Sequence, residues 1–376
     1  MIYCDNKYQL DRVVRDISTT TYKNLLILGT DFSAHNNSDD VFSHKKIYKN
    51  IELLIKNHIS SIKNGDTKLI FFFIDFWGTK TIYENDNIIN SGGLVTYNIY
   101  EWLYPQLKNL NILDHCVFVT SLSLDNVKKY HDFKIIYWNY SFNLYLKDKY
   151  VYPVKRTFNK KFFWLNRRPR EHRIYALNKF IEKKIIDNDV IYTFLLYDEN
   201  KKFNLDYINQ ILNQVYGLPP LRNYTLPPEY DIEKSEFVLY QSSVLDNIVN
   251  FTQGCWLEVI SEYNFSNHTV FHDEKIAKSI ILKNPFVVIG DRYFLREFQK
   301  LGFKTFNTIW SEEYDTLPTI EERIECISNL LIDIFKKHNW KEAYSNAIQN
   351  ILDHNYNHYY GEIKTKADNS FKEIFS

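Results

Sequence analysis

The stretch "VFHDEKIAKSIILKNPFVVIG" (residues 270–290) has the pattern of an α-helix that leads into a β-strand. Glu274 and Lys275 open an amphipathic segment that ends at Asn284 and Pro285, because proline cannot continue a helix. The apolar run 286–289 that follows has the length of a strand and stops at a glycine. The stretch therefore predicts a helix–strand unit, with two opposite charges at the start of the helix.

Strand-sized apolar runs recur along the chain, separated by segments with helical spacing. In the N-terminal half the runs are 24–32, 68–76, 115–123 and 133–142, and the helical segments are 45–65 and 96–113. A polar, basic segment with a proline follows at 145–161, and the alternation restarts with runs at 162–166, 189–197 and 255–265. Strands that alternate with helices indicate βαβ units and parallel sheets.

The alternation predicts an α/β protein made of two Rossmann-like domains that face each other across a cleft. We place the boundary in the basic segment, which gives an N-terminal domain at 1–150 and a C-terminal domain at 151–376. The last residues, from about 363, are expected to form an exposed tail. Ligands of open α/β sheets bind at the carboxyl ends of the strands, so functional residues should follow strands.

Bulk composition supports two domains and narrows the class of protein. The 376 residues are too many for one ordinary core, and the 46 Lys and Arg balance the 46 Asp and Glu. This balance argues against a general nucleic-acid binder. No apolar run reaches the roughly 18 residues of a membrane span, and no apolar signal core opens the chain. The four scattered cysteines indicate reduced thiols, so we expect a cytoplasmic protein, in the host cytoplasm if it is viral.

The densest basic feature is "FFWLNRRPREHR" (162–173), which spans a strand end, a loop and the first turn of a helix. Its basic residues are Arg167, Arg168, Arg170, His172 and Arg173. The donor-binding candidates in this stretch are Asn166, Arg167, Arg170 and Arg173. Arginines beside the free N–H groups of a helix N-terminus suit a diphosphate. The alternative is a solvated basic loop. No GxGxxG or GxxxxGK[ST] sequence occurs, which disfavours a nicotinamide or P-loop site.

Carboxylates form a second group of candidates. Glu262 follows the apolar run of 255–265, where it is placed to accept hydrogen bonds from ribose hydroxyls. Its alternative is a solvated surface glutamate. For Glu274 and Lys275 the alternative is charge placed at a helix start, where Glu complements the helix dipole.

These segments, taken in order, carry a resemblance to a known family. The run "VISEYNFSNHTVFHDEKIAKSIILKNPFVVIG" (259–290) resembles the donor-binding signature of fucosyltransferase-like GT-B glycosyltransferases. It is also similar to glycosyltransferase-like proteins of bacteriophages, as is "LGFKTFNTIWSEEYD" (301–315). The loop "LNRRPREHR" resembles the family's strand–Asn–loop–Arg element. The resemblance covers roughly residues 160–315 and implies a GT-B fold with the donor domain at 151–376 and the acceptor domain at 1–150.

The resemblance also implies roles for individual residues. Arg173 would bind the donor pyrophosphate, Glu262 and Glu274 would hold ribose or sugar hydroxyls, and Lys275 would pair with phosphate. Lys278 falls where the phage-type pattern also has lysine. The sequence departs from the pattern at three positions, where Asp273 replaces Thr, Tyr263 replaces Asn or Thr, and Ser279 replaces Pro.

The implied reaction is transfer of a sugar from a nucleoside diphosphate sugar to a hydroxyl acceptor. Cationic side chains and helix termini would stabilise the leaving diphosphate, so we expect no metal and no cofactor besides the donor. No Asp-x-Asp pair follows a predicted strand. Asp31 and Asp75 follow N-terminal strands and are candidates for the general base, although such residues are often helix caps.

Several alternatives stay open at this point. We expect a glycan acceptor rather than DNA, since the chain carries no net charge. A glycosyltransferase that acts on modified DNA bases and a non-catalytic nucleotide- or glycan-binding protein are the alternatives. The sequence does not indicate the sugar, the base, the stereochemical outcome or the oligomeric state.

Overall fold

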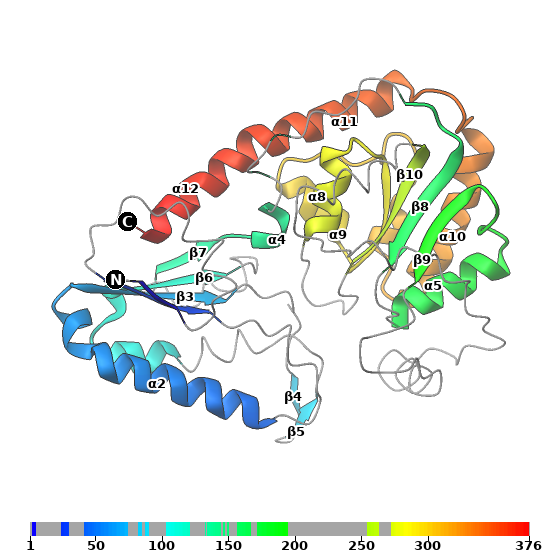
Figure 1. Cartoon of the computed structure of the whole chain (residues 1–376). Helices are drawn as coiled ribbons and strands as arrows, with labels where there is room; N and C mark the ends of the chain where they lie inside the picture. The colour runs from blue at the N-terminus through cyan, green and yellow to red at the C-terminus, as the bar shows by residue number, and fades with distance from the viewer. Residues whose placement is uncertain are drawn as a thin grey trace. The chain divides into compact units, whose positions relative to one another are not determined.

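The computed structural model describes most of the chain and divides it into two compact units. The described residues are 2–4, 24–29, 41–73, 82–84, 87–89, 103–120, 132, 134–143, 146, 149, 156–166, 171–194, 254–262 and 272–375. Unit 1 consists of Met1–Asn143, His268–Phe271 and Glu362–Ser376; unit 2 consists of Leu144–Asn267 and His272–Gly361 (Figure 1). None of the helices described is long and apolar enough to cross a membrane.

Unit 1 is built on a five-stranded parallel sheet whose strand order follows the chain. The strands, in spatial order, are β1 (Ile2–Cys4), β2 (Asn24–Gly29), β3 (Thr67–Phe73), β6 (Cys116–Thr120) and β7 (Lys134–Tyr137). Two short strands, β4 (Ile82–Glu84) and β5 (Asn87–Ile89), pair antiparallel with each other. The short helices of this unit are η3 (Leu113–His115) and α4 (Tyr140–Asn143). When parallel strands follow one another in a single direction and their connections are right-handed, the connecting helices all lie on the same face of the sheet.

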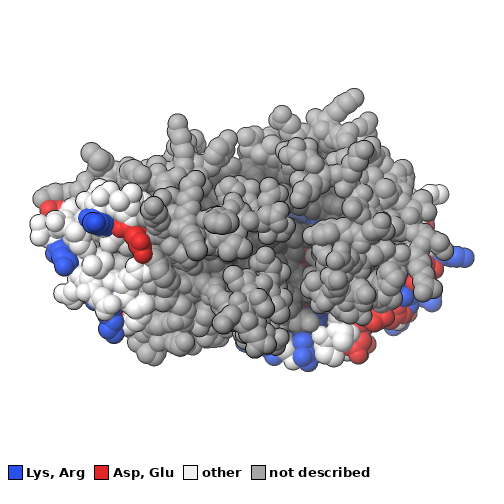
Figure 2. Space-filling view, turned by 90° about the horizontal axis from the view of Figure 1, so that it is seen from below, with Lys and Arg blue, Asp and Glu red and all other residues white. Residues whose placement is uncertain are grey.

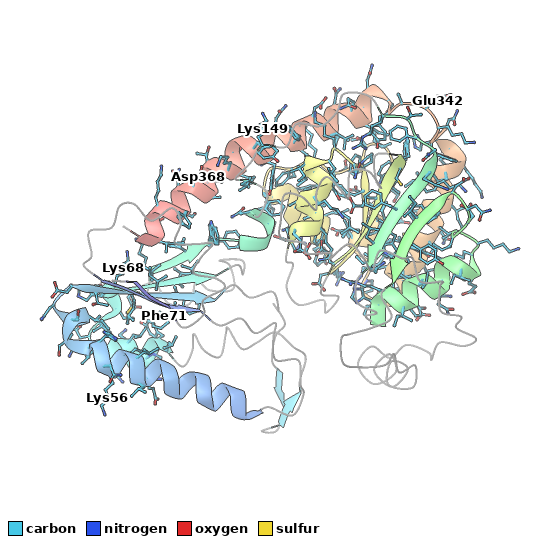
Figure 3. All side chains as sticks on the ribbon, in the orientation of Figure 1. Lys56, Lys68, Phe71, Lys149, Glu342 and Asp368 are labelled. Atoms are coloured by element: carbon cyan, nitrogen blue, oxygen red, sulfur yellow. The ribbon has the colours of Figure 1, made fainter. Side chains whose placement is uncertain are left out.

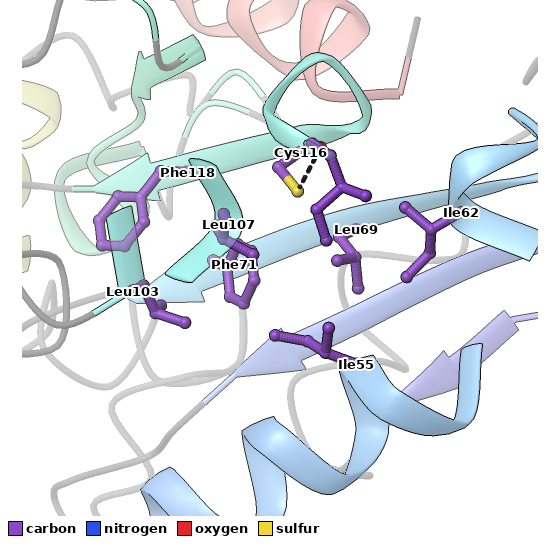
Figure 4. Close-up of a cluster of buried hydrophobic side chains, with 9 residues drawn as sticks. Ile55, Ile62, Leu69, Phe71, Leu103, Leu107, Cys116 and Phe118 are labelled. Carbon is purple, nitrogen blue, oxygen red and sulfur yellow. Dashed lines mark hydrogen bonds between the residues drawn. The ribbon is translucent and has the colours of Figure 1, made fainter. Parts of the chain in front are cut away.

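The core of unit 1 lies on that face. Helix α2 (Val41–Lys63) and the helical residues 103–109 pack against β3 and β6. Their apolar side chains enclose a buried cluster of Ile55, Ile62, Leu69, Phe71, Leu103, Leu107, Ile112, Cys116 and Phe118 (Figure 4). Phe71 lies between β3 and α2, whereas Lys56 points away from the sheet (Figure 3). The thiol of Cys116 donates to the carbonyl oxygen of Ile112, at 3.1 Å.

The opposite face of this sheet is covered by the end of the chain. Helix α12 (Lys364–Phe375) packs on β7, on the other side of the sheet from α2 (Figure 1). Phe371 contacts Trp138, with ring centroids 5.9 Å apart, and Lys134 forms an ion pair with Glu373 at 3.5 Å. Ile374 is fully buried. The expected exposed tail is therefore wrong, because this helix packs on β7 and buries Ile374.

Unit 2 is built on a four-stranded parallel sheet in which the strand order reverses. In spatial order the strands are β11 (Phe286–Ile289), β10 (Cys255–Ser261), β8 (Lys160–Asn166) and β9 (Val190–Phe194). The chain moves from β8 to β9 in one direction and then returns across β8 to β10 and β11. A topological switch point therefore lies between β8 and β10, which is where open α/β sheets bind their ligands.

Helices cover both faces of this sheet. Helix α8 (Glu274–Ile281) lies on one face with α11 (Asn346–His358), and α5 (Glu171–Glu182) lies on the other with α10 (Ile320–Lys337) (Figure 1). The remaining elements are α9 (Phe294–Lys300), η5 (Glu313–Asp315) and η6 (Tyr359–Ile363). Every residue of β10 and β11 is buried, as expected for parallel strands covered on both faces.

The predicted α/β class with two Rossmann-like parallel sheets is confirmed. The cleft between the domains, and the acceptor and donor roles of 1–150 and 151–376, stay predictions. By its contacts, the segment Glu362–Ser376 lies with unit 1, although the sequence placed it in the C-terminal domain.

Candidate functional site

The candidate site lies at the switch point of unit 2, where β8 and β10 end. Asn166 is the last residue of β8, and Glu262 directly follows β10. Their side chains are buried, with 1% and 3% of their surface exposed. The first turns of α5 and α8 bring further polar residues to the same edge. The sequence placed Asn166 and Glu262 at strand ends and the other residues at helix starts, and the fold brings the two neighbouring strand ends together.

The first turn of α5 is bonded to the end of β10. Arg173 Nη2 donates to the backbone carbonyl oxygens of Ser261 and Glu262, at 3.1 and 3.2 Å. His172 Nε2 donates to the same oxygen of Glu262 at 3.0 Å. Trp164 Nε1 donates to Ser261 Oγ at 2.7 Å. A buried guanidinium is thus fixed beside Glu262, in the α5 turn that the sequence assigned to the diphosphate.

The first turn of α8 carries a second group of charges. Asp273 is the N-cap residue and accepts from the backbone N–H of Lys275 at 2.8 Å, which satisfies one of the free N–H groups of the helix start. The ammonium group of Lys275 forms an ion pair with Asp273 and lies 3.5 Å from Glu274 Oε1. Asp273 therefore caps α8 and brings a negative charge to the start of the helix.

The three carboxyl groups at this edge have different pKa values. Burial raises the pKa of Glu262 well above its ordinary value, and the neighbouring Asp273 carboxylate raises it further. Burial and Asp273 also raise the pKa of Glu274. Burial alone would raise the pKa of Asp273, but the positive charge of Lys275 outweighs burial and lowers this pKa. The pKa of Glu262 is therefore raised, whereas that of Asp273 is lowered.

The charge of Lys275 is stabilised by the same carboxylates. Burial lowers its pKa, but Asp273, Glu274 and Glu262 outweigh burial, and the resulting pKa is raised. The positive charge of Arg173 opposes this effect. The site therefore holds two permanent positive charges inside a shell of carboxyl groups.

Among these groups, Glu262 gives the clearest indication of a ligand-binding site. Within the described residues, no donor group forms a hydrogen bond with either of its side-chain oxygens. Buried polar atoms are nearly always bonded, so an exception at a strand end needs an explanation. A ligand that donates hydroxyl hydrogen bonds would provide one.

Lys278 lies one turn further along α8 and faces the sheet. Its ammonium group pairs with Glu258 Oε1 at 2.7 Å, and both side chains are buried. Ser279 Oγ also donates to Glu258, and the ammonium lies 5.4 Å from the ring centre of Phe163. The donor-binding role of Lys278 stays a prediction, while the ion pair accounts for its position without a ligand. The glutamate inside the apolar run "CWLEVIS" was the signal for such a partner.

Four predicted site residues lie outside the described residues: Asp31, Asp75, Arg167 and Arg170. Their roles stay predictions. Within the described residues, no group of three His, Cys, Asp or Glu side chains is placed to hold a metal ion. The sequence did not single out Asp273 as a member of the site, although its position before the helix indicated an N-cap.

Comparisons with known proteins give only distant structural similarity. No family model matches the chain, and no curated protein matches it. The T4 phage β-glucosyltransferase in complex with its UDP-glucose substrate is similar with a TM-score of 0.38 and 12% identity, over 93% of this chain and 82% of that chain. A structure of the DNA-modifying enzyme β-glucosyltransferase, with and without uridine diphosphoglucose, gives a TM-score of 0.40 and 9% identity, over 94% and 81%. At TM-scores this low, no function of this chain follows from the similarity.

Proposed function

We propose that this chain is a glycosyltransferase of the GT-B type, which transfers a sugar from a nucleoside diphosphate sugar to a hydroxyl acceptor without a metal. The observation that carries the proposal is the buried carboxyl group of Glu262 at the switch point, with no donor among the described residues. A nucleotide ribose presents two adjacent hydroxyls that donate to such a group. Nucleotides bind at this place in open α/β sheets.

The diphosphate of the donor is matched by the charges beside Glu262. Arg173 brings a guanidinium on the first turn of α5, and Lys275 brings an ammonium on the first turn of α8. A guanidinium and an ammonium form charge-assisted hydrogen bonds with phosphate oxygens. Arg167 and Arg170, in the loop before α5, would add to this charge. The donor sugar would then lie at the mouth of the site, with its leaving diphosphate held by cations.

The transfer step needs two kinds of help from the protein. As the glycosidic bond to the diphosphate breaks, negative charge grows on the leaving oxygen, and fixed cations stabilise it. A carboxylate removes the proton of the attacking hydroxyl, and Asp31 or Asp75 of the N-terminal half would supply it. The acceptor is proposed to be a glycan. On the face shown in Figure 2, the described Lys and Arg side chains lie among Asp and Glu rather than in a broad basic area.

A panel of nucleotide sugars tests the proposal directly. Thermal unfolding is followed with each nucleotide sugar in turn, and a donor is expected to raise the melting temperature by binding to the native state. Turnover of a labelled donor then separates an enzyme from a binding protein. Glycans and duplex DNA with hydroxymethylated bases serve as acceptors. Failure of every nucleotide sugar to bind would overturn the proposal.

Metal independence gives a simple prediction. We expect sugar transfer to keep its full rate in EDTA, because Arg173 and Lys275 supply the positive charge that a metal supplies elsewhere. The measurement compares initial rates in EDTA and in excess manganese or magnesium. A rate that is lost in EDTA and restored by either ion would contradict the charge assignment.

Glu274 and Lys275 are expected to act on one bound donor. Each of Glu274→Gln and Lys275→Ala should weaken donor binding, by roughly 1–3 kcal/mol for a charged hydrogen bond. The double variant should lose less than the sum, since the two groups contact each other at 3.5 Å. Calorimetric titration of the three variants measures this. Wild-type affinity in Lys275→Ala would leave the pair as helix-start charges only.

A further inference from the structure

An arginine–tyrosine–arginine group lies just beyond the end of β11, where the proposed function assigns no role. The guanidinium carbons of Arg292 and Arg296 lie 4.6 and 3.7 Å from the centre of the Tyr293 ring. Guanidinium groups stack on aromatic rings at such distances. Two planar cations are thus held beside one ring, next to the carboxyl edge of the unit 2 sheet.

The backbone at Tyr293 is in an unusual conformation. Its φ of 70° and ψ of 18° lie in the left-handed region, which is unfavourable for a bulky residue and often marks a functional site. Its N–H donates to the carbonyl oxygen of Asp315 at 2.7 Å. The carboxylate of Asp315 accepts from the N–H groups of Leu295 and Arg296, at 2.8 and 3.1 Å. The start of α9 is therefore capped, and side chains rather than the helix end form the candidate subsite.

This group is tied to the donor site by two contacts. A Cβ atom on Gly290 would lie 3.4 Å from Cγ of Glu262, so the chain leaves β11 directly against that buried side chain. His272 precedes the first turn of α8, and its Nε2 donates to the carbonyl oxygen of Phe294 at 3.2 Å. The two rings also touch, with centroids 4.6 Å apart. The starts of α8 and α9 are therefore joined beside Glu262.

The order of the strand ends matches the order of the parts of a nucleotide. Strands β8, β10 and β11 are consecutive neighbours in the sheet. Neighbouring strands lie about 4.8 Å apart, so their three ends span about 10 Å. In the proposed site the diphosphate lies at Arg173, on the helix that follows β8, and the ribose lies at Glu262, at the end of β10. The base, on the other side of the ribose, then falls at the end of β11.

We propose that Arg292, Tyr293 and Arg296 form the base subsite of the donor site, and that this subsite favours the keto bases uracil and guanine over the amino bases cytosine and adenine. A guanidinium has only donors. Uracil offers O4 and guanine offers O6 and N7 as acceptors, whereas cytosine and adenine present an amino group at the matching position. Within the described residues, Arg292 forms a hydrogen bond only through Nε, to the carbonyl oxygen of Thr316 at 2.8 Å, which leaves both Nη groups for a base. This inference rests on the proposed donor site.

The charge around this group favours a base over a phosphate. Glu297 Oε1 accepts from Arg296 Nη2 at 3.1 Å and from Lys300 Nζ at 2.8 Å. Arg296 is therefore partly neutralised, and its side chain is 53% exposed, so water screens the remaining charge. Its plane can still stack on a base, and its remaining N–H groups can still donate to a keto oxygen.

The four nucleoside diphosphates UDP, CDP, GDP and ADP are the probes for the test. They carry no sugar, so the unknown donor sugar does not enter, and each pair compares a keto with an amino base of the same ring size. Calorimetric titration of the wild type gives the four affinities at one pH. In the pair that binds better, we expect the keto base to bind roughly 10- to 150-fold more tightly, as for one charged hydrogen bond.

Substitutions assign the preference to the arginines. Arg296→Met and Arg292→Met should each reduce the ratio of keto to amino affinity, by weakening the keto diphosphate and leaving the amino diphosphate nearly unchanged. Lys300→Met is the matched control, because it also removes a cation from Glu297 on the same helix, and it should keep the ratio. If Arg292→Met does not fold, Arg296→Met carries the test, since it breaks only an exposed ion pair.

The outcomes separate the base subsite from the donor site itself. Equal affinities for keto and amino bases in the wild type would overturn the base subsite and leave the donor site in place. An equal loss of affinity for all four diphosphates in Arg296→Met would place its guanidinium on the diphosphate, and would also overturn the base subsite. If none of the four binds, the proposed function falls with it.

Discussion

Replacing Lys278 by methionine is expected to lower the free energy of unfolding by about 3–5 kcal/mol, because the variant leaves Glu258 as a buried charge without its cation. The two side chains are 8% and 3% exposed, so water does not replace the lost partner. Among the described residues, only Ser279 would remain bonded to the carboxylate. Chemical denaturation of the variant and the wild type measures the difference.

Two further variants make this result specific. The double variant Glu258→Leu with Lys278→Met removes both charges and should recover most of the loss, since replacing a buried pair by apolar residues is often neutral. Lys300→Met breaks an exposed pair with Glu297 and should cost at most about 1 kcal/mol. A loss in Lys278→Met no larger than in Lys300→Met would contradict the burial argument. A stable double variant that no longer binds nucleotide sugars would show that Lys278 serves the donor.

Lys278 also shows where sequence reasoning ends. Its position in the pattern gave it a donor role, but pattern position does not say which way a helical side chain points. The burial of β10 on both faces forces Glu258 into the core, and Lys278 and Ser279 are the residues of α8 that bond it. Pairing of this kind depends on how a helix packs on a sheet, which a single sequence does not contain.

The elements themselves were more predictable than their arrangement. Buried parallel strands have apolar runs flanked by polar residues, so β3, β8, β10 and β11 were found within a few residues. The order of the strands was not predictable, because periodicity carries no information on which strands are neighbours. The reversal that brings Asn166 and Glu262 to one edge, and the docking of α12 on unit 1, emerge only in the fold.

Arg173→Ala is expected to weaken binding of the nucleotide sugar by roughly 1.5–3 kcal/mol, or about 10- to 150-fold, as the diphosphate loses a charged hydrogen-bond donor. The structure shows Nη2 bonded to the carbonyl oxygens of Ser261 and Glu262, so the variant should also lose about 1–3 kcal/mol of stability. Both quantities are measured, by calorimetric titration and by denaturation.

His172→Ala separates the two roles of Arg173, because His172 bonds the same carbonyl oxygen of Glu262 and is equally buried. If Arg173 acts on the donor through its charge, His172→Ala should lose stability but keep most of its affinity for the nucleotide sugar. Arg173→Lys should then recover part of the affinity, since lysine keeps the charge and loses the planar fork. Equal losses of affinity in Arg173→Ala and His172→Ala would mean that Arg173 only ties α5 to the end of β10, and the diphosphate would have to be held by other cations.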